Sequence, residues 1–180
     1  MRLVVVGAPG AGKSRLATAL AARTSVPLYD LDDLYWGSGW TRPDPEVWRA
    51  RQREVTGRDS WIIAGNFQPT LDIRVRRATH LIVVDPGPAV CLGRLARRTL
   101  GIYLGRTEDL PLGLRAEGRL RAGRGLTGIA RTAAHYRRVE LPRTRRLAHT
   151  HGLRPLYVGR APDLTALLAR LAPDRSTRCA

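Results

Sequence analysis

The chain of 180 residues has only two cysteines and no long apolar run. Cys91 and Cys179 are too few and too badly spaced for a metal site, and we interpret both as plain thiols. No apolar run approaches the roughly 20 residues that span a bilayer. The N-terminal segment also lacks the long apolar region and cleavage site of a signal peptide. These absences predict a cytoplasmic protein without a membrane-spanning segment.

Acidic residues are scarce as well, because 15 Asp and Glu stand against 31 Lys and Arg, a formal net charge of +16. Such a charge indicates nucleic acid as a candidate partner, since clustered basic side chains bind phosphate backbones. The arginines nevertheless run from Arg2 to Arg178, and the densest stretch covers residues 119–146. We interpret this stretch as a solvated helical face and lid in preference to a nucleic-acid platform.

Lysine is the rarest basic residue, and Lys13 is the single example in the chain. It lies in a segment that matches the Walker A pattern G-x-x-x-x-G-K-[ST]. The segment consists of Gly7, Ala8, Pro9, Gly10, Ala11, Gly12, Lys13 and Ser14. An ammonium fits the phosphate cradle of such a loop, whereas a planar guanidinium on a longer stem does not. The pattern therefore predicts an ATP-binding loop, in preference to an ordinary glycine-rich turn.

The chemistry of this loop requires each residue type. Glycines let successive backbone N–H groups point inward, and the following helix directs its positive end toward a phosphate. Lys13 is expected to reach the β- and γ-phosphates, and the Ser14 hydroxyl to bind Mg²⁺. ATP and Mg²⁺ are therefore the predicted cofactors.

Short apolar runs alternate with amphipathic segments along the chain. Strands are expected in the runs RLVVVG, VPLYDL, SWIIAGN, THLIVVD and LRPLYVG, and helices in KSRLATALAAR, DPEVWRARQREV, PAVCLGRLARRTL and APDLTALLARLA. Asp44 is a predicted N-cap, with Pro45 at the first helical position. The alternation predicts an α/β sandwich with a mostly parallel sheet.

One domain is expected over residues 1–172, followed by a flexible tail at 173–180. Two segments interrupt the alternation, at about 31–60 and about 101–125. We interpret the first as a substrate-binding insert and the second as a lid over an active site.

The motifs LDDLYWGSGW, WIIAGNF, TLDIRVRRATHLIVVD and CLGRLARR, together with the P-loop, carry a more specific resemblance. The chain resembles the adenylate-kinase-related P-loop family of DNA topology modulation proteins, whose members look like small nucleoside or nucleotide kinases. The resemblance covers roughly residues 1–105. It implies a three-layer P-loop NTPase sandwich with a five-stranded parallel sheet of the nucleotide-kinase type.

The resemblance also implies roles for residues outside the loop. Asp32 would face the phosphates or the acceptor, as a base or through a water on Mg²⁺; the alternative is a helix N-cap. Tyr35, Trp36 and Trp40 would line the acceptor pocket or, alternatively, pack the insert onto the sheet. Arg74 would hold an acceptor or transferred phosphate, or form a surface ion pair with Asp72.

Arginines of the segment 88–106 complete the predicted site. The resemblance implies that Arg94 and Arg98 contact the nucleotide at the lid entrance. Arg97 shares their helix, and Arg106 would close over the phosphoryl group; both are predicted to neutralise charge that develops in the transition state.

Two departures from the family pattern bear on function. The related pattern WIIDGN has an acid where this chain has Ala64, so Asp32 or Asp85 takes over that role or the metal site is weakened. Beyond Gly113, arginines replace much of the expected lid.

The sequence favours an ATP- and Mg²⁺-dependent phosphotransferase acting on a small acceptor. A nucleotide-dependent nucleic-acid-binding regulator and a degenerate ATP-binding protein are the alternatives.

Overall fold

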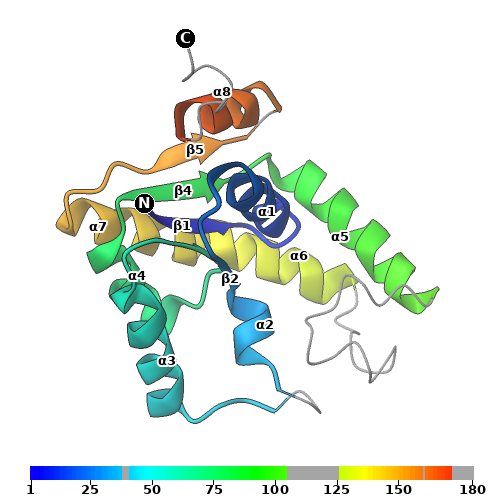
Figure 1. Ribbon diagram of the computed structural model, residues 1–180. Helices are drawn as coiled ribbons and strands as arrows, with labels where there is room; N and C mark the ends of the chain where they lie inside the picture. Colours follow the sequence, from blue (N-terminus) through cyan, green and yellow to red (C-terminus); the bar gives the residue numbers. More distant parts are fainter. Residues whose placement is uncertain (38–40, 105–125, 160, 172–180) are drawn as a thin grey trace.

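Five short parallel strands form one sheet in the order β2-β3-β1-β4-β5 (Figure 1). The computed structural model describes residues 1–37, 41–104, 126–159 and 161–171. The strands are β1 (Arg2–Gly7), β2 (Leu28–Asp30), β3 (Trp61–Ala64), β4 (His80–Val84) and β5 (Leu156–Val158). The predicted α/β architecture with a five-stranded parallel sheet is confirmed.

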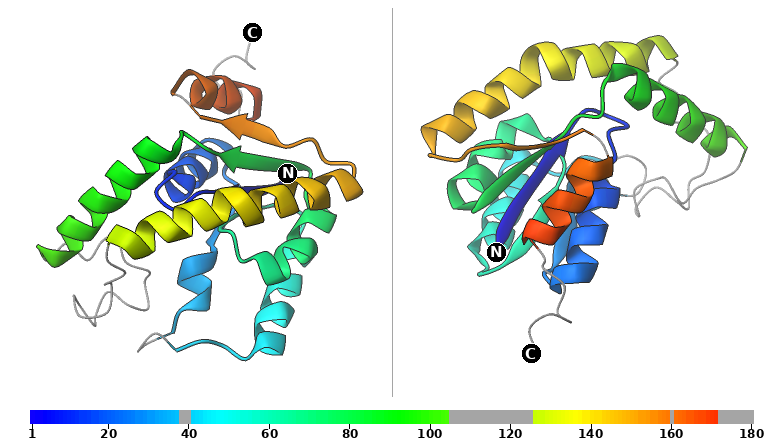
Figure 2. Two further views of the ribbon diagram at one scale, coloured as in Figure 1. Left: turned by 180° about the vertical axis from the view of Figure 1, so that it is seen from behind. Right: turned by 90° about the horizontal axis from the view of Figure 1, so that it is seen from above.

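Helices cover both faces of the sheet (Figure 2). Helix α1 (Lys13–Thr24) lies on one face against β1, β2 and β3. The opposite face carries α4 (Leu71–Arg77) and a long rod made of α6 (Leu126–His135), the π-helical segment η4 (Tyr136–Glu140) and α7 (Leu141–Thr150). Helix α8 (Ala161–Leu171) packs beside β5 at the sheet edge. The result is a three-layer sandwich.

The central strands are buried on both faces, as their apolar sequences require. Leu3, Val4, Val5 and Val6 of β1 are each 0% exposed. In a parallel sheet all strands end at the same edge, and β1, β3 and β4 run in register over most of their length. The residues that follow these strands therefore meet at one edge of the sheet, where ligands bind in open α/β folds.

The segment predicted as an insert contains two helices, α2 (Leu31–Tyr35) and α3 (Pro45–Gly57). Asp44 caps α3 as predicted, and its carboxylate accepts hydrogen bonds from the backbone N–H groups of Glu46 and Val47. A 3-10 turn, η2 (Gln68–Thr70), precedes α4. Helix α5 (Pro88–Tyr103) leads toward the predicted lid, of which residues 105–125 lie outside the described part of the chain, as does the predicted tail.

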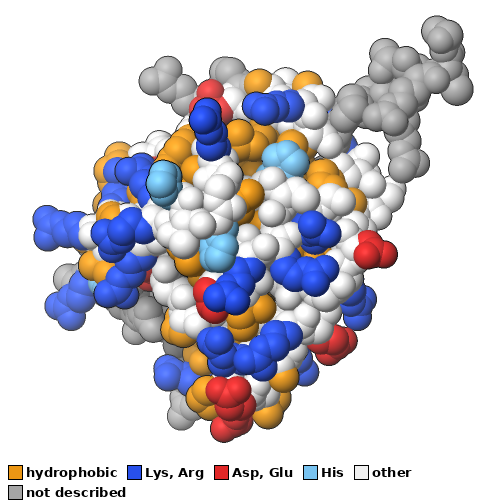
Figure 3. All heavy atoms as spheres, turned by 90° about the vertical axis from the view of Figure 1, so that its left-hand side faces the viewer, with side chains coloured by type: hydrophobic (Ala, Val, Ile, Leu, Met, Phe, Trp, Pro, Cys, Tyr) orange, Lys and Arg blue, Asp and Glu red, His pale blue; other side chains and the backbone are white. Residues whose placement is uncertain are grey.

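Arginines are spread over the face shown in Figure 3, with hydrophobic and acidic side chains between them. Two arginines of the described residues stack on tyrosines: the guanidinium carbon of Arg58 lies 5.6 Å from the ring centre of Tyr29, and that of Arg145 lies 5.3 Å from the ring centre of Tyr157. Within the described ranges, no helix is long and apolar enough to cross a bilayer.

Candidate functional site

The P-loop connects β1 to α1 with the geometry that its sequence predicts. Gly10 and Gly12 adopt positive φ angles of 77° and 98°, a region that favours glycine. A side chain at position 10 would also meet the Cys91 carbonyl oxygen, because a Cβ there would lie 2.5 Å from it. These two glycines therefore allow the chain to turn tightly into the helix that begins at Lys13.

Lys13 lies at the centre of this loop and is half-buried. Its Nζ donates hydrogen bonds to the carbonyl oxygens of Gly7 and Ala8, at 3.0 and 3.2 Å. Burial lowers the pKa of Lys13, and the nearby carboxylates of Asp32 and Asp30 partly oppose this effect. The ammonium is thus held over the loop by the loop's own backbone.

Asn66, directly after the β3 strand, holds the end of β1. Its Oδ1 accepts a hydrogen bond from the Gly7 N–H, and its Nδ2 donates to the Gly7 carbonyl, both at 3.1 Å. Asn66 belongs to the motif WIIAGNF, but the sequence analysis assigned it no role. The amide fixes the position from which the P-loop departs.

Asp30 forms a hydrogen bond with the P-loop, whereas the sequence analysis had named Asp32 and Asp85 as the acids of the site. The Ser14 hydroxyl donates to Asp30 Oδ2 at 2.7 Å, and Asp30 Oδ1 accepts from the backbone N–H of Asp32 at 2.9 Å. Asp30 is therefore the N-cap of α2, a role that the sequence analysis considered for Asp32. It lies opposite Ala64 in the β2–β3 register.

Asp32 lies two residues after Asp30 and is exposed to solvent. The space over the P-loop beside these two acids, where a phosphate would bind, is called the phosphate cleft below. Desolvation by surrounding protein atoms raises its pKa, and the charge of Asp30 acts in the same direction. The positive charges of Lys13 and Arg98 oppose this rise. The predicted role of Asp32, as a base or through a water on Mg²⁺, stays a prediction.

The oxygen atoms near Ser14 suit a hard cation. A serine hydroxyl and an aspartate carboxylate 2.7 Å apart are donors of the kind that Mg²⁺ prefers. Ala64 is 1% exposed and supplies no oxygen from its side chain. Within the described ranges, no group of three or more His, Cys, Asp and Glu could hold a metal ion. Ser14 and Asp30 are therefore the candidate protein ligands, and a cation held there would need further oxygen ligands from solvent and phosphate.

Helix α5 brings Arg94 to the loop, where its guanidinium donates a hydrogen bond to the Ala11 carbonyl at 2.9 Å. Arg98 follows one turn later on this helix, and its charge opposes the raised pKa of Asp32. Arg97 is exposed on the same helix. Arg106 lies outside the described residues, so the predicted closure over the phosphoryl group is not tested.

The aromatic residues of the insert form a cluster. Tyr35 packs edge-on against Trp36 and Trp48, with ring centres 4.9 and 5.0 Å apart, and lies 4.5 Å from Phe67. Arg42 lies over the Trp36 ring. The contacts match the packing role that was the alternative to an acceptor pocket, although Tyr35 and Trp36 remain partly exposed. Trp40 lies outside the described residues.

Arg74 requires a correction. Its side chain is buried, at 0% exposure, and its guanidinium donates to the carbonyl oxygens of Gly65, Asn66 and Phe67. Asp72 pairs instead with Arg49 at 3.8 Å. Both predicted roles, phosphate contact and surface ion pair, are wrong because the side chain is buried and both terminal nitrogens of its guanidinium hold the loop after β3. Arg74 thereby supports Asn66, which holds the P-loop.

The segment η4 contributes charged residues that the sequence analysis did not single out. Arg137 forms an ion pair with Asp85, which follows β4, so Asp85 is engaged there and not at Ser14. Glu140 has a raised pKa because of burial, and Lys13 is among the cations that oppose this rise. Pro142 lies within a long helical stretch, and this proline is the sequence feature that could have predicted an irregular segment here.

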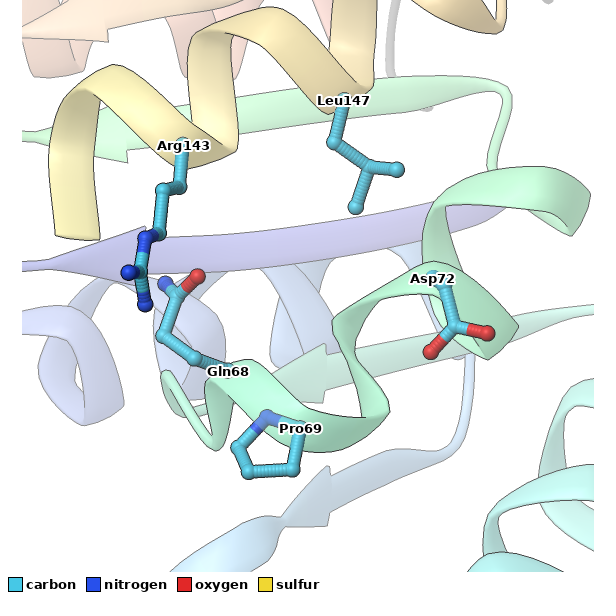
Figure 4. A pocket seen from close by; sticks show the side chains of 5 residues that line it. All are labelled: Gln68, Pro69, Asp72, Arg143 and Leu147. Carbon is cyan, nitrogen blue, oxygen red and sulfur yellow. The ribbon is translucent and has the colours of Figure 1, made fainter.

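A pocket of about 370 Å³ lies between η2, α4 and α7 (Figure 4). Its lining consists of Gln68, Pro69, Asp72, Arg143 and Leu147. Gln68 donates to the Thr144 hydroxyl at 3.1 Å and so links the loop after β3 to α7. None of the P-loop residues lines this pocket, which is separate from the phosphate cleft.

Solved structures with a similar fold include two shikimate kinases. The enzyme from Acinetobacter baumannii, in complex with shikimate, has a TM-score of 0.59 and 14% identity over 99% of this chain and 95% of that chain. The enzyme from Bacteroides thetaiotaomicron has a TM-score of 0.55 and 18% identity over 95% of each chain. At these identities the likeness shows the fold alone, which is the P-loop NTPase kinase fold.

No family model and no curated protein sequence matches the chain. The predicted resemblance to DNA topology modulation proteins is therefore not confirmed and stays a prediction.

Proposed function

We propose that this protein is an ATP- and Mg²⁺-dependent phosphotransferase that acts on a small hydroxyl-bearing acceptor. The observation that carries the proposal is the arrangement of Lys13, Ser14 and Asp30. An ammonium and a hydroxyl–carboxylate pair lie together on a phosphate-binding loop at the start of a helix. The kinase fold of the similar structures supports the same class of reaction.

The chain's own groups account for the steps of such a transfer. The loop N–H groups and Lys13 would bind the β- and γ-phosphates and orient them for in-line attack. Ser14 and Asp30 would hold Mg²⁺, which supplies neutralisation of phosphate charge. Asp32 would accept the proton of the acceptor hydroxyl as its oxygen bonds to the γ-phosphorus and the bond to the ADP oxygen breaks. Arg94 and Arg98 would contact the nucleotide.

The proposal is tested by replacing the single lysine. Lys13→Ala should weaken ATP binding by about tenfold to a hundredfold, the usual value of a hydrogen bond to a charged group. Isothermal titration calorimetry with ATP and Mg²⁺ measures this change. Arg15→Ala is the matched control, since Arg15 is an exposed cation two residues further along α1. Unchanged ATP affinity in Lys13→Ala would contradict the proposal.

A further inference from the structure

The rod α6–η4–α7 changes its helical geometry next to the phosphate cleft. The Leu141 N–H donates to the Tyr136 carbonyl, five residues earlier, which is the hydrogen bond of a π-helix. Pro142 lacks the N–H that a regular α-helix would use at this point, and its ring is incompatible with a close carbonyl one turn earlier. The wider turn accommodates the proline and changes the direction in which Glu140 leaves the rod.

Glu140 has one carboxylate oxygen without a hydrogen-bond partner. Its Oε1 lies 3.9 Å from His135 Nε2, whereas Oε2 is buried and has no partner among the described residues. The side chain is 22% exposed. Arg137 of the same segment pairs with Asp85, which follows β4, and the end of β4 lies beside Gly7 of the P-loop, so η4 lies at the P-loop edge of the sheet. The charges of Glu140 and Lys13 also act on each other. A buried acceptor atom without a donor costs free energy, which a ligand N–H or O–H group would recover.

Three arginines of the described residues that could hold an anionic acceptor are engaged elsewhere. Arg74 is buried against three carbonyl oxygens, and Arg137 is paired with Asp85. The charge of Arg143 also opposes the raised pKa of Glu140, and the Arg143 side chain lines the separate pocket beside Gln68. Asp32 adds a second carboxylate at the cleft. Arg94 and Arg98 belong to the same site, but the proposed function assigns them to the nucleotide. Among the described residues, the carboxylates of Asp32 and Glu140 are therefore the groups that remain for an acceptor.

We propose that Glu140 binds the acceptor by accepting a hydrogen bond from one of its N–H or O–H groups, and that the acceptor is a hydroxyl compound without negative charge, such as a polyol or an amino alcohol. The inference rests on the proposed phosphotransferase function and specifies its substrate class. It distinguishes this chain from the structural relative whose complex contains shikimate, which is a carboxylate.

The first experiment compares acceptors that differ only in charge. ADP release by the wild-type protein, with ATP and Mg²⁺, is measured with glucosamine, glucose and gluconate, with methyl shikimate and shikimate, and with cytidine and cytidine 5′-monophosphate. At least one uncharged or amine compound should be phosphorylated, with a kcat/KM about tenfold or more above its anionic counterpart, as expected for one charged contact. A preference for the anionic member of a set overturns the inference.

The second experiment removes the charge of Glu140. Glu140→Gln should raise KM for the preferred acceptor about tenfold while KM for ATP and the unfolding temperature stay nearly constant. Glu54→Gln is the matched control, because Glu54 is 70% exposed and pairs with Arg58 within α3. Equal acceptor KM values in the two variants, or equal increases in both KM values of Glu140→Gln, would overturn the assignment of Glu140.

The two proposals fail in different ways. If ATP binds in a Lys13-dependent manner but no uncharged or amine compound is phosphorylated, the substrate class is wrong and the nucleotide site stands. If ATP does not bind, the proposed function itself is wrong.

Discussion

At the scale of single residues, the phosphate cleft depends on two acids in the short segment Asp30–Leu31–Asp32. Asp30 accepts a hydrogen bond from the Ser14 hydroxyl and caps α2, while the charges of Lys13 and Arg98 act on Asp32. Asp30 also faces Ala64 in the register of β2 and β3, so a carboxylate lies beside the position where the resemblance implied an acid. We infer that the two acids have separate tasks, one at the metal and one at the acceptor.

Asparagine substitutions separate these tasks, because asparagine keeps the shape and the capping ability of aspartate without its charge. Asp30→Asn should raise the Mg²⁺ concentration needed for half-maximal turnover about tenfold, by loss of a charged ligand. Asp32→Asn should lower kcat by about 10², the scale of general-base loss, with ATP binding nearly unchanged. Magnesium titrations and calorimetry measure both effects, with Asp33→Asn as control.

The pH profile provides a second measurement for Asp32. A base acts in its unprotonated form, and the pKa of Asp32 is raised by desolvation and by Asp30. As pH falls, Asp32 is therefore protonated earlier than an ordinary aspartate, and kcat should decline from a higher pH. This acidic limb should be absent in Asp32→Asn. Turnover within a few-fold of wild type in that variant would assign Asp32 a structural role.

At the scale of elements, the irregular segment η4 determines which residues the long rod presents to the cleft. Tyr136 at its start is 1% exposed, Arg137 reaches Asp85, and Glu140 lies near Lys13. In a regular α-helix successive residues are about 100° apart around the axis, because one turn contains 3.6 residues. Removal of one residue from the wide turn would therefore rotate the rest of the rod by about 100°. We infer that the π geometry is retained for the position of Glu140.

Pro142→Ala tests this inference, since alanine restores the backbone N–H and favours a regular helix. The variant should be more stable, with an unfolding temperature higher by roughly 2–4 °C for each kcal/mol gained. Its turnover should nevertheless fall about tenfold, because Glu140 loses its contact with the acceptor. Thermal unfolding and ADP release measure the two effects, and Pro155→Ala in the loop before β5 is the control. Full activity in a stabilised variant would show that the π turn is dispensable.

At the scale of the whole molecule, the excess of arginine dominates the electrostatics. The formal net charge is +16, and on the face that Figure 3 shows acidic and hydrophobic side chains lie between the arginines. A spread charge attracts polyanions without reading their sequence. Some of the arginines are also structural, as Arg74 shows, so net charge overstates the number that are available to a partner.

Binding to DNA should therefore be weak, insensitive to sequence and independent of ATP. Fluorescence anisotropy with two unrelated duplexes of equal length should give the same affinity, falling by about 10³ between roughly 50 and 200 mM salt. Binding that persists at the higher salt concentration, differs between the duplexes or requires ATP would favour the nucleic-acid-binding function over the kinase.

Local sequence patterns determined the strands, the Walker A loop and the cap of α3. These features depend on neighbours in the chain: glycine for positive φ, a buried apolar run for a central strand, and an aspartate before a proline for a helix start. They determined a parallel α/β fold with Lys13 and Ser14 at the turn from β1 into α1, and all of this could be predicted without coordinates.

Only the tertiary structure decided which further residues reach that loop. The meeting of Asp30 with Ser14 follows from strand order and register, since residues 16 positions apart become neighbours across the sheet edge. Arg74 resembles a substrate-binding arginine in sequence, but its position under the β3 loop buries it against carbonyl oxygens. Glu140 carries no local motif, and the packing of the rod together with one wide turn at Pro142 brings it near Lys13. Such contacts depend on the packing of distant segments, which local propensity does not encode.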